Sequence, residues 1–340
     1  MHAGTPTAPP PKVSVLIVAY NRQEYLERAV RSALASTLPR AEFEIVVVKN
    51  FLNPALDAFL AHEGVRVLQE GPATVGGFMA RGLAAARGRI LALLNDDDEF
   101  EADKLARVVE RFASVPDLTY YHDRRVLVDP GGKPLPVRSR WERPQTAPFV
   151  IASEADRRSK VGAVHRGRGL FHDSCISVDR SVLDRHRELL EGVEVSEDAF
   201  TYYCALASPG TLFFDDRRLT RFRVHALSKY RKEKTGPRDP RVEARRRALI
   251  VSLETITRGT PAEPAAKVFR VVTTHQAFLE GEGGRRPGAG EYWDLFVVFL
   301  RYRVPSHAAL LALSALKLLA PHRTTTFFGR FWASLDDTVT

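Results

Sequence analysis

Three consecutive carboxylates, Asp96, Asp97 and Asp98, follow the apolar run 89–95 and form the sharpest chemical signal in the chain. Adjacent negative charges repel one another, so their clustering is costly unless a cation neutralises them. Carboxylate oxygens suit Mg²⁺ or Mn²⁺, and a metal held by one or two carboxylates commonly bridges to substrate phosphates. The alternative is a solvated acidic turn before the next helix, because Asp and Glu are favoured at helix N-termini.

These carboxylates need a scaffold, and the first part of the chain alternates buried strands with helices. Strands are predicted at 13–20, 43–48, 65–69 and 89–95, and helices near 24–36, 54–62 and 76–88. Continuous apolar runs indicate strands buried on both faces, and short connections between strand and helix are typical of a doubly wound, mostly parallel α/β sheet. Ligands bind beyond the carboxyl ends of such strands, which makes candidates of residues 19–22, 49–50 and 95–98.

The composition limits the class of protein. The chain has 340 residues, of which 44% are hydrophobic and 27% charged, which excludes a disordered chain and a disulfide-stapled mini-protein. Two cysteines, Cys175 and Cys204, together with an N-terminus that does not resemble a signal peptide, predict a reducing, cytoplasmic location. The net charge of +9 predicts attraction to polyanions, but no nucleic-acid-binding motif accompanies it.

Three regions are predicted along the chain: a disordered tail at 1–12, an α/β domain at 13–235 and a helical C-terminal region at 236–340. The Arg-rich stretch 138–168 is interpreted as a long loop that either contacts an acceptor phosphate or is mobile. The apolar segments 291–305 and 307–321 are too short to span a bilayer. They predict either helices that lie on the cytoplasmic face of a membrane, or a helical pair that packs on the α/β domain or on another subunit.

Four motifs, in their order and spacing, resemble family 2 glycosyltransferases of the GT-A fold over roughly residues 12–230. They lie in the segments VSVLIVAYNRQEYLERAVRSAL (13–34), GFMARGLAAARGRILALLNDDDEF (77–100), SEDAFTYY (196–203) and RFRVHALSKY (221–230). The resemblance implies transfer of a sugar, with inversion at the anomeric carbon, from a nucleotide-sugar donor to a hydroxyl of a glycan or polyprenyl-linked acceptor. It also implies a divalent metal, Mn²⁺ or Mg²⁺, on the donor diphosphate.

The resemblance further implies roles for individual residues. The positions expected to line the nucleotide or its diphosphate are Ala19, Tyr20, Asn21, Arg22, Lys49, Arg81, Asn95, Asp96 and Arg223. Asp97 and Asp98 are expected to hold the metal, with the register open by one residue because three carboxylates are contiguous. His225 is expected to ligate the metal or bond a phosphate, and Arg223 to stabilise the leaving group. For Arg81 the alternative is an exposed helix arginine, and for His225 a structural histidine.

Glu197 and Asp198 match the acidic pair that opens the acceptor-side helix of the family. Inversion needs a general base on the acceptor hydroxyl, placed opposite the leaving diphosphate. Asp198 is expected to be this base and Glu197 to position it. The alternative is a helix N-cap, because Ser196 followed by two acidic residues is good capping chemistry.

Two positions depart from the family pattern. Lys49 and Asn50 stand where an acidic residue commonly contacts the base, and Gly82 stands where Asn is frequent. An ammonium cannot accept a hydrogen bond from a uracil N–H, so the base of the donor stays open. The altered strand end favours a second hypothesis, a non-catalytic relative that binds a nucleotide-sugar or glycan, whereas the intact carboxylates oppose it. A sugar nucleotidyltransferase is disfavoured because no glycine-rich loop follows the first strand.

Overall fold

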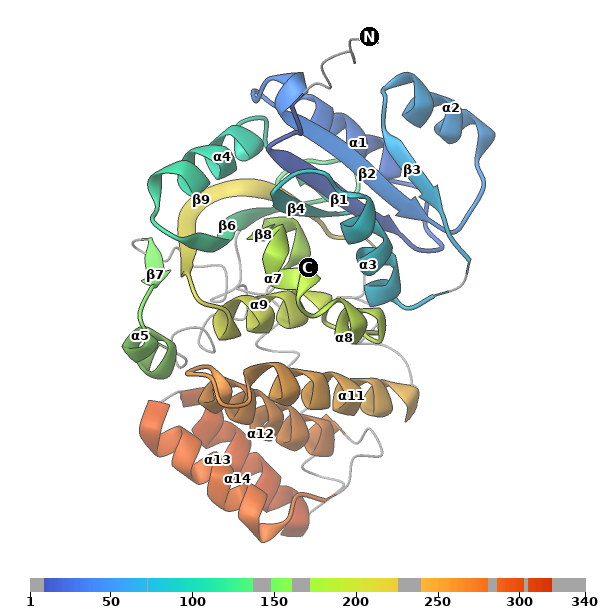
Figure 1. Cartoon of the computed structure of the whole chain (residues 1–340). Coiled ribbons are helices and arrows are strands. Elements are labelled where there is room, and N and C mark those ends of the chain that lie inside the picture. The colour runs from blue at the N-terminus through green and yellow to red at the C-terminus, as the bar shows by residue number, and fades with distance from the viewer. Residues whose placement is uncertain are drawn as a thin grey trace.

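A mixed β-sheet forms the centre of the molecule (Figure 1). The computed structural model describes residues 9–71, 73–136, 148–160, 172–225, 240–280, 286–302 and 305–319. Its strands are β1 (Val13–Ala19), β2 (Phe43–Lys49), β3 (Arg66–Gln69), β4 (Ile90–Asn95), β5 (Glu99–Phe100), β6 (Leu118–Val128), β7 (Phe149–Ile151), β8 (Ile176–Asp179) and β9 (Thr211–Arg223). They are ordered β3-β2-β1-β4-β8-β6-β9-β5, and β7 also pairs with β9.

The sheet is parallel in its first half and mixed in its second. β2 pairs in parallel with β1 and β3, and β1 pairs in parallel with β4, as the apolar runs predict. The strand direction changes at the neighbour of β4 in the sheet, since β8 runs antiparallel to both β4 and β6. β9 then lies parallel to β6 and antiparallel to β5 and β7. The predicted, mostly parallel α/β sheet is confirmed, with the change of strand direction after β4.

Helices cover both faces of the sheet. The helices in chain order are α1 (Leu26–Leu34), α2 (Pro54–His62), α3 (Val75–Ala85), α4 (Lys104–Ser114), α5 (Glu154–Ser159), α7 (Arg180–Asp184), α8 (Arg187–Glu191) and α9 (Glu197–Ala207), with short 3₁₀ turns at Arg40–Glu42 and Asp173–Cys175. Alternate residues of one strand point to opposite faces. Val15 and Ile17 therefore pack in the core under α1, α2 and α4, while Leu16 packs in the core under α3 and α7 to α9.

The start and packing of α3 follow from local chemistry. Thr74 caps the helix, since its Oγ1 accepts the backbone N–H of Gly77 at 2.8 Å. A Cβ at Gly82 would lie 2.1 Å from Leu16 Cδ1, and a Cβ at Gly76 would lie 1.9 Å from the carbonyl oxygen of Leu190. Glycine is thus required where α3 lies directly on β1 and on α8, and this contact explains why no larger side chain stands at position 82.

The C-terminal region consists of α11 (Pro240–Thr257), α12 (Glu263–Glu280), α13 (Ala289–Tyr302) and α14 (Pro305–Leu319), which lie beyond α9 (Figure 1). Leu249 and Leu253 of α11 join the core beneath the sheet, and the Tyr203 hydroxyl of α9 donates to the Ala265 carbonyl at 3.1 Å. α11 and α12 thus pack on the α/β domain. The predicted boundary at 235 lies outside the described residues.

The outer helices leave an apolar face exposed. Leu295 and Leu310 pack in a small core between α12, α13 and α14, whereas four side chains on one face of α13 are exposed: Trp293, Phe296, Val297 and Leu300. Among the described helices, none is both long and apolar enough to cross a bilayer. Contact of this face with a membrane surface or with another subunit stays a prediction.

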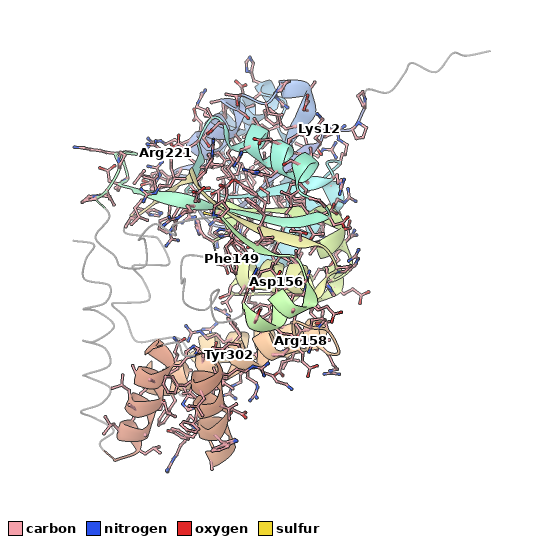
Figure 2. All side chains as sticks on the ribbon, turned by 90° about the vertical axis from the view of Figure 1, so that its left-hand side faces the viewer. Lys12, Phe149, Asp156, Arg158, Arg221 and Tyr302 are labelled. Carbon is pink, nitrogen blue, oxygen red and sulfur yellow. The ribbon has the colours of Figure 1, made fainter. Side chains whose placement is uncertain are left out.

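The Arg-rich stretch 138–168 is described only between 148 and 160. There Arg157 of α5 is 5% exposed, and its guanidinium donates to the carbonyls of Leu206 and Ser208, both at 3.0 Å. Figure 2 shows α5, labelled at Asp156 and Arg158, at the level between the sheet and the C-terminal helices. Arg157 therefore anchors α5 to the end of α9. The other arginines of the stretch lie outside the described residues, apart from Arg158, which forms an ion pair with Glu154.

A fully buried ion pair joins α4 to the second half of the sheet. Lys104 and Asp123 are each 0% exposed, and the Lys104 ammonium bonds the Asp123 carboxylate, the Ser174 carbonyl at 2.6 Å and the Thr220 hydroxyl at 2.9 Å. Burial raises the pKa of Asp123 to about 6, against the opposing charge of Lys104. The pair is thus satisfied on both sides, and it fixes the strands next to the Asp96–Asp98 turn.

Replacing Lys104 by Met should destabilise the protein by about 3–5 kcal/mol, because it leaves a buried, uncompensated carboxylate. Adding Asp123→Asn to Lys104→Met should recover at least half of this loss, since the unpaired charge is then gone. Denaturant unfolding followed by circular dichroism measures both. A Lys104→Met variant as stable as the wild type would show that the pair contributes nothing.

Acid should weaken the C-terminal helices through two buried histidines. Burial lowers the pKa of His307 to about 4 and also lowers the pKa of His275, which is 0% exposed. The unfolded chain protonates near pH 6.5, so stability should fall as the pH drops from 6.5 to 4, by up to about 3 kcal/mol from His307. Urea unfolding at pH 7 and 4.5 tests this. His307→Leu should flatten the dependence, whereas His62→Leu, at a side chain 84% exposed, should not.

Candidate active site at the carboxyl edge of the sheet

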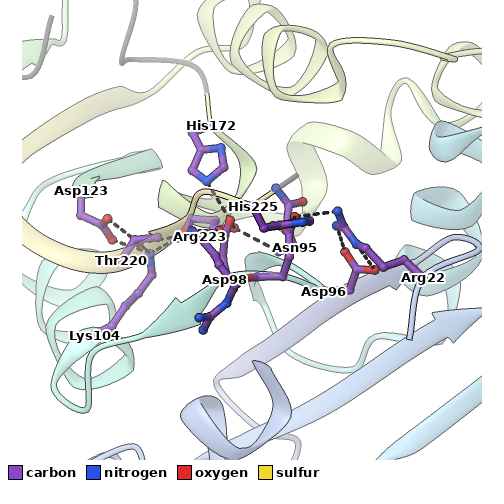
Figure 3. A network of polar contacts seen from close by, with 12 residues as sticks. Arg22, Asn95, Asp96, Asp98, Lys104, Asp123, His172, Thr220, Arg223 and His225 are labelled. Atoms are coloured by element: carbon purple, nitrogen blue, oxygen red, sulfur yellow. Dashed lines mark hydrogen bonds and ion pairs between the residues drawn. The ribbon is translucent and has the colours of Figure 1, made fainter. Parts of the chain in front are cut away.

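The predicted strand ends meet at one edge of the sheet. β1, β2 and β4 are parallel neighbours, so residues 19–22, 49–50 and 95–98 follow adjacent strand ends. Asp96, Asp97 and Asp98 form the turn between β4 and β5, in which Figure 3 labels Asp96 and Asp98. Each of the three carboxylates has a different set of partners.

Asp96 is held by Arg22, which follows β1. The Arg22 Nε donates to Asp96 Oδ2 at 3.1 Å, and its Nη2 contacts Asp96 Oδ1 (Figure 3). The Arg22 Nη1 lies 2.7 Å from Asp97 Oδ2, so one guanidinium bridges two carboxylates. Burial raises the pKa of Asp96 to about 6, and the bonds from Arg22 oppose that shift. Arg22 thus reaches the acidic turn, which puts it at the predicted donor edge.

Asp97 pairs with His225, which follows β9. The His225 Nε2 lies 3.0 Å from Asp97 Oδ2. A carboxylate can only accept, so this nitrogen carries the proton. Among the described residues, the hydrogen bonds and ion pairs of the Asp97 side chain all use Oδ2, which leaves Oδ1 available. The side chain is 12% exposed, so a ligand can approach Asp97 from solvent.

Asp98 is fully engaged inside the protein. Its Oδ2 accepts from His172 Nε2 at 2.8 Å and from the Ser174 hydroxyl, and its Oδ1 accepts from the Arg223 backbone N–H at 3.0 Å. Burial alone would raise its pKa, but the charge and bond of His172 and the other donors lower it. With 1% of the side chain exposed, Asp98 holds the turn in place, and its expected role as a metal ligand stays a prediction.

Arg223 is also structural. Its side chain is 0% exposed, and its guanidinium lies over the Tyr25 ring. It donates to backbone carbonyls of Asp97 at 3.1 Å, Asp129 at 3.0 Å and Pro130 at 2.8 Å, and contacts the Glu99 carboxylate. These acceptors engage the whole guanidinium. A direct contact of Arg223 with the diphosphate stays a prediction.

Lys49, expected to contact the donor, is buried as well. Its ammonium donates to the Phe51 carbonyl and to Gln69 Oε1 at 3.0 Å, and it lies 2.8 Å from Asp57 Oδ1. Three acceptors match the three N–H donors, and 1% of the side chain is exposed. Lys49 therefore anchors the connection from β2 to α2, and a contact between Lys49 and the donor stays a prediction.

The polar side chains accessible at this strand end are Asn21 and Asn50. The Asn50 Oδ1 accepts the Asn21 backbone N–H at 2.8 Å, and its Nδ2 donates to Asn21 Oδ1 at 2.8 Å. These bonds hold Asn21 in the left-handed region, with φ of 54°. Next to it, Tyr20 is 46% exposed and meets the Phe78 ring edge-on at 5.5 Å, whereas Ala19 is buried.

Arg81 lies apart from these residues. Its side chain on α3 is 68% exposed, and its nearest ion-pair partner, Glu70, is 3.9 Å away. This is the exposed helix arginine of the alternative interpretation. A contact between Arg81 and a nucleotide stays a prediction.

A small cavity adjoins the acidic turn. Its wall is aliphatic from β1, α3 and β4, and polar where it is lined by Asn95, Asp173 and Glu197. Glu197 thus lines the same cavity as Asn95 at the end of β4, and Glu197 is 8% exposed. Asp198 is half-buried, and its Oδ1 accepts the Ala199 backbone N–H at 2.7 Å.

Ser196 does not cap α9 in the expected way. It occupies the N-cap position with φ of 56°, and its side chain makes no capping bond. A non-glycine residue in this region costs roughly 1–2 kcal/mol and is uncommon outside sites that need it. The Ser196 side chain thus makes no contribution to capping, whereas Asp198 accepts a backbone N–H in the first turn of α9, so the capping alternative stays open for the acidic pair.

The sequence analysis did not identify His172 and Ser174 as residues of the site. They lie just before β8, and only the antiparallel pairing of β8 with β4 brings them to Asp98. The sole signal in the sequence is the polar cluster His172–Ser174 before an apolar strand, which by itself does not identify a partner.

The described residues do not include three His, Cys, Asp or Glu side chains placed to share one metal ion. They do include a pair, His225 Nε2 and Asp97 Oδ2, 3.0 Å apart. Mg²⁺ and Mn²⁺ are commonly held by one or two protein ligands, with phosphate and water oxygens completing the shell. A pair with one available carboxylate oxygen fits such an ion.

Two curated relatives match part of this chain. It is 37% identical over 108 residues to the succinoglycan biosynthesis protein ExoO of Rhizobium meliloti, which covers 30% of each protein. It is 35% identical over 107 residues to an uncharacterized glycosyltransferase of Nostoc sp., covering 30% of this chain and 33% of that one. The matches thus span about a third of the length of these relatives.

Solved structures of S. aureus TarS share the fold. TarS 1–349 in complex with UDP-GlcNAc superposes with a TM-score of 0.57 at 14% identity, covering 78% of this chain and 72% of that one. TarS 1–349 gives a TM-score of 0.54 at 16% identity, covering 92% and 90%. The family model described as glycosyl transferase family 2 matches residues 14–183, which is half of the chain. Together with the parallel strand ends and the acidic turn, this match shows that the chain belongs to glycosyltransferase family 2.

Proposed function

We propose that this glycosyltransferase moves a sugar from a nucleoside diphosphate-sugar to an acceptor hydroxyl with inversion of configuration. One observation carries the proposal: the cavity that begins at Asn95, where the acidic turn starts, is walled on its other side by Glu197. A donor diphosphate at the turn would place its sugar toward the cavity. The start of α9 would then face the acceptor.

The exposed strand ends would bind the nucleoside. Tyr20 offers an exposed ring, and Asn21 and Asn50 offer amides that both donate and accept hydrogen bonds. Because Asn50 rather than Lys49 presents its side chain here, an acceptor for a uracil N–H is available. The TarS structure in complex with UDP-GlcNAc supports a UDP-sugar as the first donor to test.

Asp97 and His225 would hold a divalent metal, and Asp96 would stay bonded to Arg22 beside them. The metal would supply positive charge on the leaving diphosphate. Asp97 contributes its available Oδ1, while the proton on His225 Nε2 must leave this nitrogen before it can act as a ligand. Asp98 takes no direct part, but its bonds to His172 and Ser174 set the direction in which Asp97 points.

Asp198 would accept the proton of the acceptor hydroxyl as that oxygen attacks the anomeric carbon. Its half-buried position at the first turn of α9 keeps it close to solvent, and Glu197 beside it lines the cavity. The negative charge of Asp198 lies near the buried Tyr120 hydroxyl, whose pKa is raised by burial first and by neighbouring charges second.

A glycan is the proposed acceptor class, in line with a relative named for succinoglycan biosynthesis. A polyprenyl-linked acceptor would require the protein to work at a membrane, and the exposed apolar face of α13 is compatible with contact at the cytoplasmic surface. The second hypothesis, a non-catalytic binding module, predicts donor binding without release of nucleoside diphosphate.

A panel of UDP-, GDP- and dTDP-sugars with Mn²⁺ or Mg²⁺ tests the donor proposal. We expect one base class to bind in calorimetry with metal present and to be slowly hydrolysed to the nucleoside diphosphate. Asp97→Ala should lower this binding by about tenfold or more, because the carboxylate nearest solvent is lost. Binding without any nucleoside diphosphate release would favour the binding module, and no binding with either metal would reject the proposal.

The general base is tested by Asp198→Asn. This variant should bind the donor as the wild type does but lose transfer by about 10²-fold or more, since proton abstraction from the acceptor fails. Glu197→Gln serves as the matched change one residue away and should reduce transfer less. Normal turnover by Asp198→Asn would remove this residue from the role.

A further inference from the structure

The guanidinium of Arg22 lies against Asp97, the carboxylate that a divalent cation would use. Its Nη1 lies 2.7 Å from Asp97 Oδ2, the same oxygen that lies 3.0 Å from His225 Nε2. The remaining nitrogens of Arg22 bond both oxygens of Asp96. Figure 3 shows this side chain reaching the acidic turn from the end of β1.

Arg22 places one positive charge against two of the three carboxylates. Asp98 has its own donors, whereas Asp96 and Asp97 form no ion pair with another Lys or Arg in the described part of the chain. A cation that approaches Asp97 therefore meets a positive charge already in place. Repulsion between unit charges about 4 Å apart amounts to several kcal/mol at a protein surface.

Arg22 can move more easily than its partners. Its side chain is 24% exposed, whereas the Asp96 side chain is 5% exposed. Arg22 sits in the segment between β1 and α1, directly after Asn21, whose backbone is fixed by Asn50. A change of side-chain rotamer would thus carry the guanidinium away from the carboxylates without moving the sheet.

We propose that Arg22 is a resident counter-ion that competes with the divalent metal for Asp97. Metal ions then bind weakly to the free protein and tightly when a diphosphate attracts the guanidinium away from the turn. Metal and nucleoside diphosphate consequently strengthen each other's binding, by the same factor in both directions. This inference rests on the proposed function, because it concerns the order in which the same site fills.

Mn²⁺ binding in the absence of nucleotide tests the competition directly. Removing Arg22 alone would leave Asp96 as a buried, unpaired charge, so the comparison is made in the Asp96→Asn background. The double variant Arg22→Gln/Asp96→Asn should bind Mn²⁺ at least about tenfold more tightly than Asp96→Asn alone. Calorimetry, or the electron paramagnetic resonance signal of free Mn²⁺, measures both affinities. Equal affinities in these two folded variants would overturn the inference.

Arg28→Gln in the same Asp96→Asn background controls for the loss of one positive charge. Arg28 is 43% exposed and pairs with Glu99 rather than with Asp96 or Asp97, so its removal should leave Mn²⁺ affinity within about twofold. If Arg28→Gln tightened Mn²⁺ binding as much as Arg22→Gln, a general change of charge would account for the effect and the proposal would fail.

Linkage between metal and nucleotide gives the second readout. UDP should raise the Mn²⁺ affinity of the Asp96→Asn protein by about fivefold or more, and by a smaller factor when Arg22 is also replaced. If UDP raised the Mn²⁺ affinity by the same factor with and without Arg22, the inference would be overturned, whereas the proposed sugar transfer would be unaffected. Failure of the wild type to bind any nucleotide would instead reject the proposed function, and the nucleotide-free Mn²⁺ comparison still decides the role of Arg22.

Discussion

Three adjacent carboxylates at the end of a buried strand can be accommodated only if each finds its own donors, and this constraint organises the site. Asp96 is matched by Arg22, Asp97 by His225, and Asp98 by His172 and other donors. These partners come from three separate segments of the chain, so the paired form of the turn depends on the assembled sheet. The electrostatic cost of the cluster is thereby coupled to the whole α/β domain.

The carboxylates differ in function because they differ in exposure. Asp98, with 1% of its side chain exposed and its oxygens bonded, is a fixed part of the scaffold. Asp97, 12% exposed and with one oxygen available, can still gain a ligand. Arg223 contacts both residues: its buried guanidinium donates to the Asp97 backbone carbonyl, and its backbone N–H donates to the Asp98 carboxylate. The fixed Asp98 and Arg223 thus orient Asp97, the more exposed carboxylate.

Backbone strain marks two places in this region. Asn21 at the end of β1 and Ser196 at the start of α9 have positive φ without being glycine. Asn21 is stabilised by a pair of bonds to Asn50, whereas the side chain of Ser196 makes no capping bond. Such conformations persist only where the surrounding packing imposes them. Here α11 packs beneath α9, so the C-terminal helices help to hold the α9 side of the cavity.

The sequence by itself determined the parallel strands, the strand-end position of Asp96 to Asp98 and the family resemblance, because apolar periodicity and short motifs are local properties. The tertiary structure alone decided which carboxylate is fixed and which is open, and it buried Lys49 and Arg223, which looked like ligand contacts. The physical reason is that hydrogen-bond partners such as His172 reach the turn through the antiparallel pairing of β4 with β8, a long-range contact that no local pattern encodes.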